Sequence, residues 1–463
     1  MNIIVIMLDS FRTDHIGAYA GDQTKAKTPH IDRFAQEALV FNQAYTGSFP
    51  TLPCRRDLFT GRWGHPFHTW SALERGPQTM AETFRRAGYV TGLVFDTPMF
   101  MTEGNFLDRG FGSIEWISDG LEKIELPAAE HKVKAAGLRR YLLNQSRRRF
   151  ESDYLIARTM TEATHWLERN YTQDQFFLWV DAWDPHEPWD PPQYYVDQYD
   201  PGYEGDVVMY PCYGFSRDFM SEAELNHVRA LYAAEVTMVD RWVGHFLETI
   251  EVLGLREDTV VVLMSDHGHY FGDHGLQGKP WGDLGQLYEP MTHIPFMMAL
   301  PGKNIGREVT GIVQPVDLFP TLCTLADLEL PEGVQGTSFD PLIKGATEAH
   351  RSYAISGRNL DDHWGTCPAT VTDGTWTLVY WPNKDLAYEN PPVRQETYTV
   401  TGMPERRRDE LFYMPDDPDQ QHNLLDTHPA EAQRLHQALL DLIAEADTDP
   451  LIAETYQPVP SRR

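Results

Sequence analysis

The sequence of 463 residues lacks several features that would point to a membrane or secreted protein. It has no run of about 18 apolar residues, which a membrane-spanning helix would need. The first ten residues, MNIIVIMLDS, have no basic segment and no small-residue cleavage site of the kind found in secretory signals. Cysteines are few and far apart, with no Cys-x-x-Cys pair, which excludes a zinc knuckle and a disulfide framework. They are Cys54, Cys212, Cys323 and Cys367. We therefore expect a cytoplasmic protein that does not bind a membrane.

Positive charge is also scarce. Lys and Arg number 39 against 68 Asp and Glu, which gives a formal net charge of -29. This balance argues against nucleic acid as a partner. A small anionic substrate remains compatible with it, because a metal ion or a few basic groups can reverse the field inside a cleft. The hydrophobic fraction of 41% is enough for a sizeable core and excludes a disordered chain.

The pattern of apolar runs predicts an α/β fold. Continuous apolar runs cover residues 3–8, 89–95, 175–180 and 259–264, and helical patterns lie beside them. Such runs are typical of strands buried on both faces, so we expect a large, mostly parallel sheet sandwiched by helices. From residue 349 onward we expect a smaller α+β subdomain, with a hairpin around Asp373-Gly374 and an amphipathic helix over residues 429–446. The catalytic domain would then span residues 1–348 and the subdomain residues 349–463.

One segment leaves the oligomeric state open. Residues 120–150 are irregular and locally basic. They are consistent with a helical insertion or the edge of a lid, or else with a contact in a homo-oligomer or part of the wall of a cleft.

Three of the predicted strands end in residues that can bind a metal ion. Asp9 follows the first strand, Asp181 the third, and Asp266 with His267 the fourth. Because sites in parallel sheets gather outside the carboxyl ends of the strands, these side chains should lie close together. Carboxylate and imidazole ligands suit a divalent cation.

A second candidate element is the segment 51–62, TLPCRRDLFTGR, which reads as a turn that enters a helix. Thr51 could serve only as the N-cap of that helix. The alternative is that its hydroxyl lies at the positive end of the helix dipole, where a metal ion would lower its pKa and make it a nucleophile. Arg55, one turn further on, would then hold that oxygen or an anionic substrate.

These segments resemble sequence motifs of the sulfatase branch of the alkaline phosphatase superfamily. The motifs follow one another in the order typical of that family and cover nearly the whole chain. The shared segments are 8–17 (LDSFRTDHIG), 51–62, 184–189 (DPHEPW), 265–268 (SDHG), 272–275 (GDHG) with 278–279 (GK), 316–322 (VDLFPTL) and 416–424 (DDPDQQHNL).

The resemblance implies a role for each matching residue. Asp9, Asp266 and His267 would bind the metal ion, and Thr51 would complete its shell as the nucleophile. Arg55 would orient Thr51. His186 and Lys279 would bind the oxygens of the substrate or protonate the leaving group. The metal would be Mn²⁺ or Zn²⁺, with Ca²⁺ or Mg²⁺ also possible.

The sequence also departs from the family pattern. Sulfatases oxidise Cys or Ser at the nucleophile position to formylglycine, and threonine cannot form that aldehyde. Cys54 is three residues out of register and does not substitute for it. The motif around Asp266-His267 is closer to that of phosphonate monoester and phosphodiester hydrolases. We therefore expect a metal-dependent hydrolase of phosphodiesters or phosphonate monoesters that works through a covalent phospho-threonine.

Other interpretations of the same residues stay open. The chain could be a sulfuric ester hydrolase without formylglycine, or an inactive homologue that only binds ligands. A second metal ion is also conceivable. Its candidate ligands would be Asp181, Asp184, His186 and His274.

Overall fold

The computed structural model describes residues 1–65, 72–97, 105–118, 148–280, 284–358, 368–382, 408–446, 448 and 450–458. Most of the basic segment 120–150 and Cys367 lie outside the described residues. No helix of the described part is long and apolar enough to cross a membrane.

The core of the molecule is an eight-stranded sheet with the order β12-β2-β11-β8-β1-β6-β4-β5. Only β11 runs antiparallel to its neighbours, so the prediction of a mostly parallel sheet is confirmed. The strands are β1 (Asn2–Leu8), β2 (Leu39–Phe41), β4 (Val90–Phe95), β5 (Ser113–Trp116), β6 (Phe176–Ala182), β8 (Thr259–Ser265), β11 (Phe296–Ala299) and β12 (Arg307–Val309).

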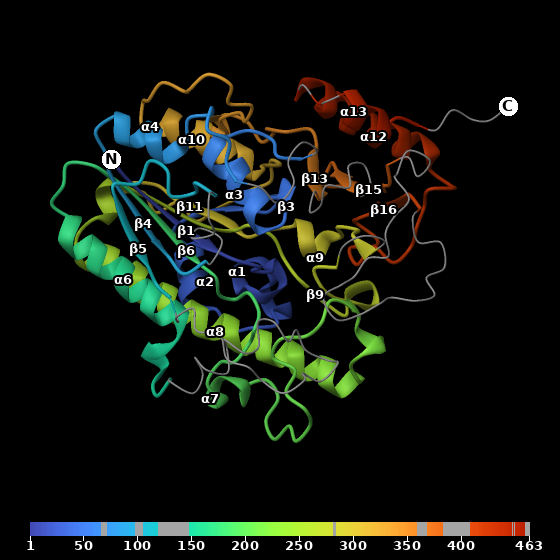
Figure 1. Cartoon of the computed structure of the whole chain (residues 1–463), viewed down its shortest axis with the longest axis horizontal. Helices are drawn as coiled ribbons and strands as arrows, with labels where there is room; N and C mark the ends of the chain where they lie inside the picture. The colour runs from blue at the N-terminus through green and yellow to red at the C-terminus, as the bar shows by residue number, and fades with distance from the viewer. Residues whose placement is uncertain are drawn as a thin grey trace.

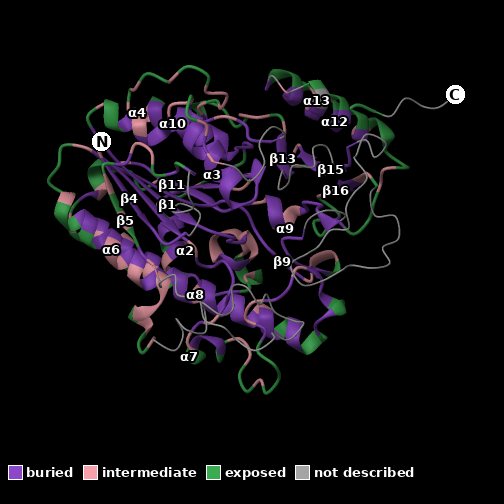
Figure 2. Cartoon of the chain, in the orientation of Figure 1, coloured by how far each residue is buried: buried purple, intermediate pink, exposed green. Residues whose placement is uncertain are grey.

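Helices cover both faces of this sheet (Figure 1). Successive side chains of a strand point to opposite faces, and in β1 Ile4 and Ile6 enter one apolar cluster while Ile3 and Val5 enter another. The first cluster includes side chains of α2 (Pro29–Ala35), α6 (Leu155–Asn170) and α8 (Glu222–Val252). The second includes side chains of α3 (Thr51–Thr60), α4 (Met80–Arg86) and α10 (Leu318–Leu325). Figure 2 shows most of the strands between these layers as buried, whereas β5 and β12 at the two edges of the sheet are only partly buried.

The longest helix, α8, begins at a capping box. The Ser221 hydroxyl accepts a hydrogen bond from the Glu224 N–H, and the Glu224 carboxylate accepts one from the Ser221 N–H. Two N–H groups that the helix leaves unpaired are thereby satisfied, which fixes where the helix starts.

A second sheet of five strands has the order β16-β15-β14-β13-β3. The strands are β3 (Ser48–Phe49), β13 (Ala354–Arg358), β14 (Ala369–Thr372), β15 (Trp376–Tyr380) and β16 (Glu410–Tyr413). The predicted hairpin is the β14–β15 pair, and the predicted amphipathic helix is α12 (Pro429–Glu445), which packs on these strands. Unlike the others, β3 belongs to the N-terminal part of the chain and pairs in parallel with β13.

The three strands whose ends carry the predicted ligands are neighbours. β1 lies between β8 and β6 and is parallel to both, with Leu8 in register with Ala182 and Ser265. Their carboxyl ends therefore open onto the same edge of the sheet. The N-terminus of α3 and a small sheet of β7 (Gly214–Phe215), β9 (Tyr270–Phe271) and β10 (Leu276–Gly278) contribute to the same region.

Candidate metal centre and active site

Asp9, Asp266 and His267 form a buried cluster at this edge. One ligand atom of each lies within 4.8 Å of those of the other two, and all three side chains are fully buried. Asp9 extends from β1, and Asp266 and His267 follow β8. In the part of the chain that the structure describes, this is the only group of three such side chains that could hold a metal ion.

The donor atoms of the cluster suit a cation. His267 Nδ1 lies 2.8 Å from the Gly268 carbonyl oxygen, to which it donates, so that Nε2 carries a lone pair on the side of the carboxylates. One Asp9 oxygen, Oδ2, is buried without a hydrogen-bond partner. Two carboxylates and an imidazole thus converge in one buried cluster, in which Asp266 also accepts hydrogen bonds from the N–H groups of Ser10 and His267 and from Arg55. A divalent cation would satisfy all three groups.

The charges of the cluster interact strongly. Burial and the neighbouring Asp266 carboxylate raise the pKa of Asp9 well above its usual value. Burial would also raise the pKa of Asp266, but His267 and Arg55 outweigh it and lower that pKa. Burial lowers the pKa of His267 to about 4, so the ring is neutral at pH 7 and able to bind a metal ion.

Thr51 faces this cluster from the start of α3. It is the first residue of the helix, and Pro50 occupies the N-cap position, so the structure does not use Thr51 as the cap. Its Oγ1 lies 3.3 Å from His267 Nε2, and the residue is only 2% exposed. The hydroxyl is therefore held at the positive end of a ten-residue helix, next to the candidate metal ligands.

Arg55 neutralises part of the negative charge of the cluster. Its guanidinium lies 2.6 Å from an Asp266 oxygen, 3.3 Å from Asp9 and 2.7 Å from Asp181. Asp181 therefore binds Arg55, and the structure gives it this role in place of the considered role as a ligand of a second metal ion. Because both Nε and Nη2 of Arg55 donate to Asp181, the guanidinium is fixed in one orientation.

Lys279 reaches the cluster through Ser10. Its Nζ lies 3.1 Å from Ser10 Oγ, which in turn donates to Asp9 Oδ1 at 2.8 Å. Ser10 has a φ of 61°, a left-handed conformation that costs a non-glycine residue about 1 to 2 kcal/mol. In this conformation its backbone N–H donates to Asp266 Oδ1 at 3.0 Å. The strained residue thus joins both candidate metal carboxylates to the lysine.

Glu187 links the remaining predicted residues, although no role was predicted for it. Its buried carboxylate lies 3.1 Å from Lys279 Nζ, 3.2 Å from His186 Nδ1 and 3.5 Å from His269 Nδ1, and it accepts a hydrogen bond from Tyr213. It stands in the DPHEPW segment next to His186. Its place beside His186 in that segment is the only feature of the sequence that could have pointed to a role for Glu187.

The structure gives three other considered residues contacts or surroundings of their own. Asp184 accepts a hydrogen bond from the Ile156 N–H, and the His274 ring stacks on Tyr288 with the centroids 3.6 Å apart. Cys54 is buried, and burial raises the pKa of its thiol well above the usual value, so it is a poor nucleophile.

Residues 1–328 match the sulfatase family. Similar proteins include an arylsulfatase of Clostridium perfringens, 24% identical over 76% of this chain and 80% of its own. A multifunctional alkaline phosphatase superfamily protein, PehA of Trinickia caryophylli, is 23% identical over 74% of this chain and 77% of its own. Among solved structures, the phosphonate monoester hydrolase of Agrobacterium radiobacter has a TM-score of 0.72 at 21% identity and covers 96% of both chains.

Proposed function

The chain belongs to the sulfatase family of ester hydrolases, and within that family we propose that it hydrolyses phosphodiesters or phosphonate monoesters with Thr51 as the nucleophile. The observation that carries the proposal is the position of Thr51. Its buried hydroxyl lies at the N-terminus of α3 and 3.3 Å from an imidazole of the candidate metal cluster. A threonine there cannot become formylglycine, so we assign the attack to the hydroxyl itself.

The charges of the site favour a substrate with a single negative charge. Four buried carboxylates, Asp9, Asp181, Asp266 and Glu187, face two buried cations, Arg55 and Lys279. A divalent ion would bring this formal charge to zero. A neutral site accepts the monoanionic centre of a phosphodiester or phosphonate monoester more readily than the dianion of a phosphate monoester.

Asp9, Asp266 and His267 would hold the metal ion, and Thr51 would face it. Once bound, the ion would lower the pKa of the Thr51 hydroxyl and offset negative charge on the substrate. We favour Mn²⁺ or Zn²⁺ because the ligands include an imidazole.

The residues of the chain then have distinct tasks. Thr51 Oγ1 releases its proton to solvent and forms a bond to phosphorus while the bond from phosphorus to the leaving oxygen breaks. Lys279 or His186 gives that oxygen a proton and regains one from solvent. Arg55, fixed by Asp181, stabilises negative charge beside Thr51. Water then attacks phosphorus, the bond to Thr51 breaks, and the hydroxyl is restored with release of the second product.

Hydrolysis of sulfate esters is the second candidate. A sulfate monoester is also a monoanion, so the charge argument admits it equally. The similarity to the arylsulfatase of Clostridium perfringens favours it. If this chain hydrolyses sulfate esters, the unmodified Thr51 hydroxyl would be its nucleophile.

A rate panel distinguishes the two candidates. The substrates are bis(p-nitrophenyl) phosphate, p-nitrophenyl phenylphosphonate, p-nitrophenyl phosphate and p-nitrophenyl sulfate, each with added MnCl₂ and then ZnCl₂. Thr51→Ala is the blank, Thr51→Ser tests whether another hydroxyl can replace the nucleophile, and Cys54→Ala is a control at a buried neighbour on the same helix. Mass spectrometry after rapid acid quenching locates any covalent phosphate.

We expect the diester or phosphonate to be the best substrate, Thr51→Ala to lose at least a thousandfold in kcat/KM, and phosphate to be found on Thr51. A dominant rate on the sulfate ester would show that Thr51 at the nucleophile position does not indicate a phosphodiester or phosphonate hydrolase. Retained activity in Thr51→Ala would exclude Thr51 as the nucleophile.

A further inference from the structure

Glu187 has no task yet in the reaction proposed for this site, although its carboxylate is fully buried beside the groups that would carry it out. Its Oε2 lies 3.1 Å from Lys279 Nζ, and its Oε1 accepts a hydrogen bond from the Tyr213 hydroxyl. An ammonium and a hydroxyl both donate, so these contacts favour the charged form of the carboxylate. A buried negative charge thus lies directly beside a cation that would bind the substrate.

The Lys279 ammonium is held by three neighbours. Its Nζ lies 3.1 Å from Ser10 Oγ, 3.1 Å from Glu187 Oε2 and 3.3 Å from His269 Nδ1. A lysine ammonium has three N–H groups and no acceptor, so His269 Nδ1 accepts from it and the His269 ring is neutral. Of these three neighbours, Glu187 is therefore the one that carries a charge.

The backbone around Lys279 is fixed as well. Gly278 has a φ of 81°, and a Cβ at this position would lie 1.9 Å from Tyr213 Cδ1, so glycine is what lets the tyrosine ring pack here. The Arg358 guanidinium donates to the carbonyl oxygen of Lys279 at 2.8 Å and to that of Pro280. A packed framework therefore keeps the ammonium next to the Glu187 carboxylate.

The charge of Lys279 reaches the metal cluster. Burial and Asp266 raise the pKa of Asp9, and the positive charges of Arg55 and Lys279 act in the opposite direction. Lys279 and Glu187 are only 5% and 0% exposed, so water screens their charges little. Glu187 therefore offsets a positive charge that would otherwise act on an ester bound at this cluster.

The formal charge of the whole site depends on this carboxylate. With Glu187, the four carboxylates and two cations of the site are balanced by one divalent ion. Without it, three carboxylates, two cations and the ion leave one positive charge. This additional charge would stabilise a dianion about twice as much as a monoanion, because the Coulomb energy is proportional to the product of the charges.

We propose that Glu187 determines the charge class of the substrate: by offsetting Lys279, its carboxylate favours monoanionic esters over dianionic phosphate monoesters. The inference rests on the proposed function, because it takes Lys279 to face the ester. It applies equally to phosphodiesters, phosphonate monoesters and sulfate esters, since all three are monoanions. Glu187 acts through Lys279 and is a positioning residue.

Isothermal titration calorimetry on the full chain, at pH 8 with MnCl₂, measures binding separately from turnover. All proteins in this experiment carry Thr51→Ala, so that no ester is consumed. The probes are dimethyl phosphate, a monoanion, and methyl phosphate, which is dianionic at this pH because its second pKa is about 6. The quantity compared between variants is the ratio of the two Kd values.

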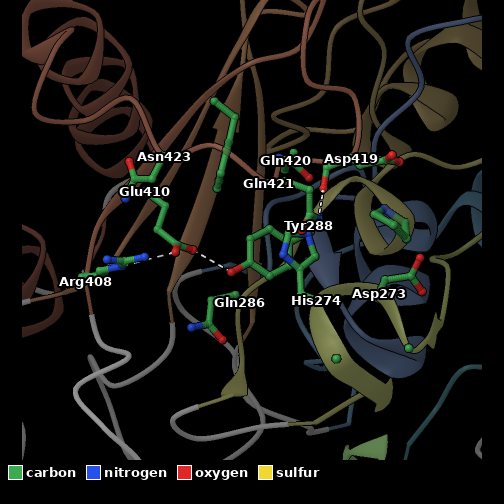
Figure 3. A pocket seen from close by; sticks show the side chains of 14 residues that line it. Asp273, His274, Gln286, Tyr288, Arg408, Glu410, Asp419, Gln420, Gln421 and Asn423 are labelled. Carbon is green, nitrogen blue, oxygen red and sulfur yellow. Dashed lines mark hydrogen bonds and ion pairs between the residues drawn. The ribbon is translucent and has the colours of Figure 1, made fainter. Parts of the chain in front are cut away.

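Two substitutions of Glu187 separate its charge from its shape. Glu187→Gln removes the charge and keeps the shape, whereas Glu187→Asp keeps the charge. Glu410→Gln is the matched control, because Glu410 also accepts from a tyrosine, Tyr288, and lies 3.5 Å from a basic side chain, Arg408. Figure 3 shows these three side chains in a cavity of 740 Å³ whose lining includes no residue of the metal cluster. If Glu187→Gln does not fold, Lys279→Gln is compared with the double variant Lys279→Gln, Glu187→Gln, which has neither charge.

We expect Glu187→Gln to shift the Kd ratio by about tenfold or more toward methyl phosphate, whereas Glu187→Asp and Glu410→Gln should keep the ratio of the parent. The double variant should show the same shift relative to Lys279→Gln. An unchanged ratio in Glu187→Gln would mean that the carboxylate only supports the fold. An equal shift in Glu187→Asp would mean that shape decides and not charge. Either result overturns the inference, as does failure of both phosphates to bind the parent.

The rate panel on the wild type keeps this result separate from the proposed function. If no ester is hydrolysed but the Kd ratio shifts as expected, the proposed function fails and the role of Glu187 stands. If the diester or the phosphonate is hydrolysed but the ratio does not shift, the proposed function stands and the role of Glu187 fails.

Discussion

The candidate metal cluster predicts that removing one carboxylate has opposite effects with and without metal. In Asp9→Asn, the amide oxygen can still accept the hydrogen bond from Ser10 Oγ, but the charge is lost. Burial and the neighbouring Asp266 disfavour that charge in the metal-free protein, as the raised pKa of Asp9 shows. With chelator present, the variant should therefore be at least as stable as the wild type at pH 8. With metal present, it should be less stable because one ligand is missing.

The size of the effect follows from linkage. A metal ion at 100 times its Kd stabilises the folded state by about 2.7 kcal/mol. An unfolding entropy of about 2.1 cal/mol/K per residue gives about 1 kcal/mol/K for 463 residues, so the expected rise in Tm is about 3 °C. The wild type should show this rise with Mn²⁺ or Zn²⁺, and Asp9→Asn should show little of it.

The pH dependence has a definite sign. The folded pKa of Asp9 lies well above its ordinary value of 3.8, so without metal the folded state binds this proton more tightly than the unfolded state. That contribution to stability is fully present below pH of about 4 and is lost as the pH rises through the folded pKa. Metal binding requires the deprotonated carboxylate, so the gap in Tm between metal-loaded and chelator-treated protein should widen with pH.

Differential scanning fluorimetry at pH 6, 7 and 8, with EDTA or with each metal, measures all of these shifts. Asp22→Asn, at an exposed position, is the matched control and should behave as the wild type. An equal metal-induced shift in Asp9→Asn would refute the assignment of Asp9 as a ligand. A wild type that responds to no divalent cation would refute the metal centre itself.

Three further predictions concern stability and are measured by urea denaturation. Asp181→Asn should lower the free energy of unfolding by about 1 to 3 kcal/mol. Both carboxylate oxygens of Asp181 accept hydrogen bonds, so the amide N–H₂ of asparagine would face a donor in either orientation. An unchanged urea midpoint would contradict this prediction. Gly268→Ala should cost more than about 2 kcal/mol, because its Cβ would lie 1.9 Å from the Pro290 carbonyl oxygen, whereas Gly76→Ala, with nothing within 4 Å, should be neutral. Ser221→Ala removes the cap of α8 and should cost about 1 kcal/mol; no loss would mean that solvent replaces the cap.

Periodicity was sufficient to predict the parts of the fold that carry a strong pattern. The central strands are continuous apolar runs, the hairpin strands alternate around Asp373-Gly374, and residues 429–445 have the apolar spacing of a helix. The reversed direction of β11 could not be predicted in this way, because a strand buried on both faces has the same composition in either direction. β3 has only two residues and therefore no period at all.

Some residues of the candidate site could likewise be predicted from the sequence and others could not. The positions of Asp9, Asp266 and His267 at neighbouring strand ends follow from the rule for parallel sheets, and the structure brings these residues together. The partner of Asp181 does not follow from that rule. A carboxylate at a strand end can bind a metal ion or a guanidinium, and only the path of α3 places Arg55 beside it. Glu187 was missed because its partners come from segments that are distant in the sequence.

The pairing of β3 with β13 affects how the chain could be shortened or recombined with relatives. Ser48 and Phe49 precede Thr51 by only a few residues, and their backbone is hydrogen-bonded to a strand that starts at Ala354. A gene truncated after codon 348 would therefore remove the strand that anchors the approach to the nucleophile. Chimeras that exchange the C-terminal region would have to exchange residues 48 and 49 with it, so we expect the two segments to vary together and active truncations to be rare.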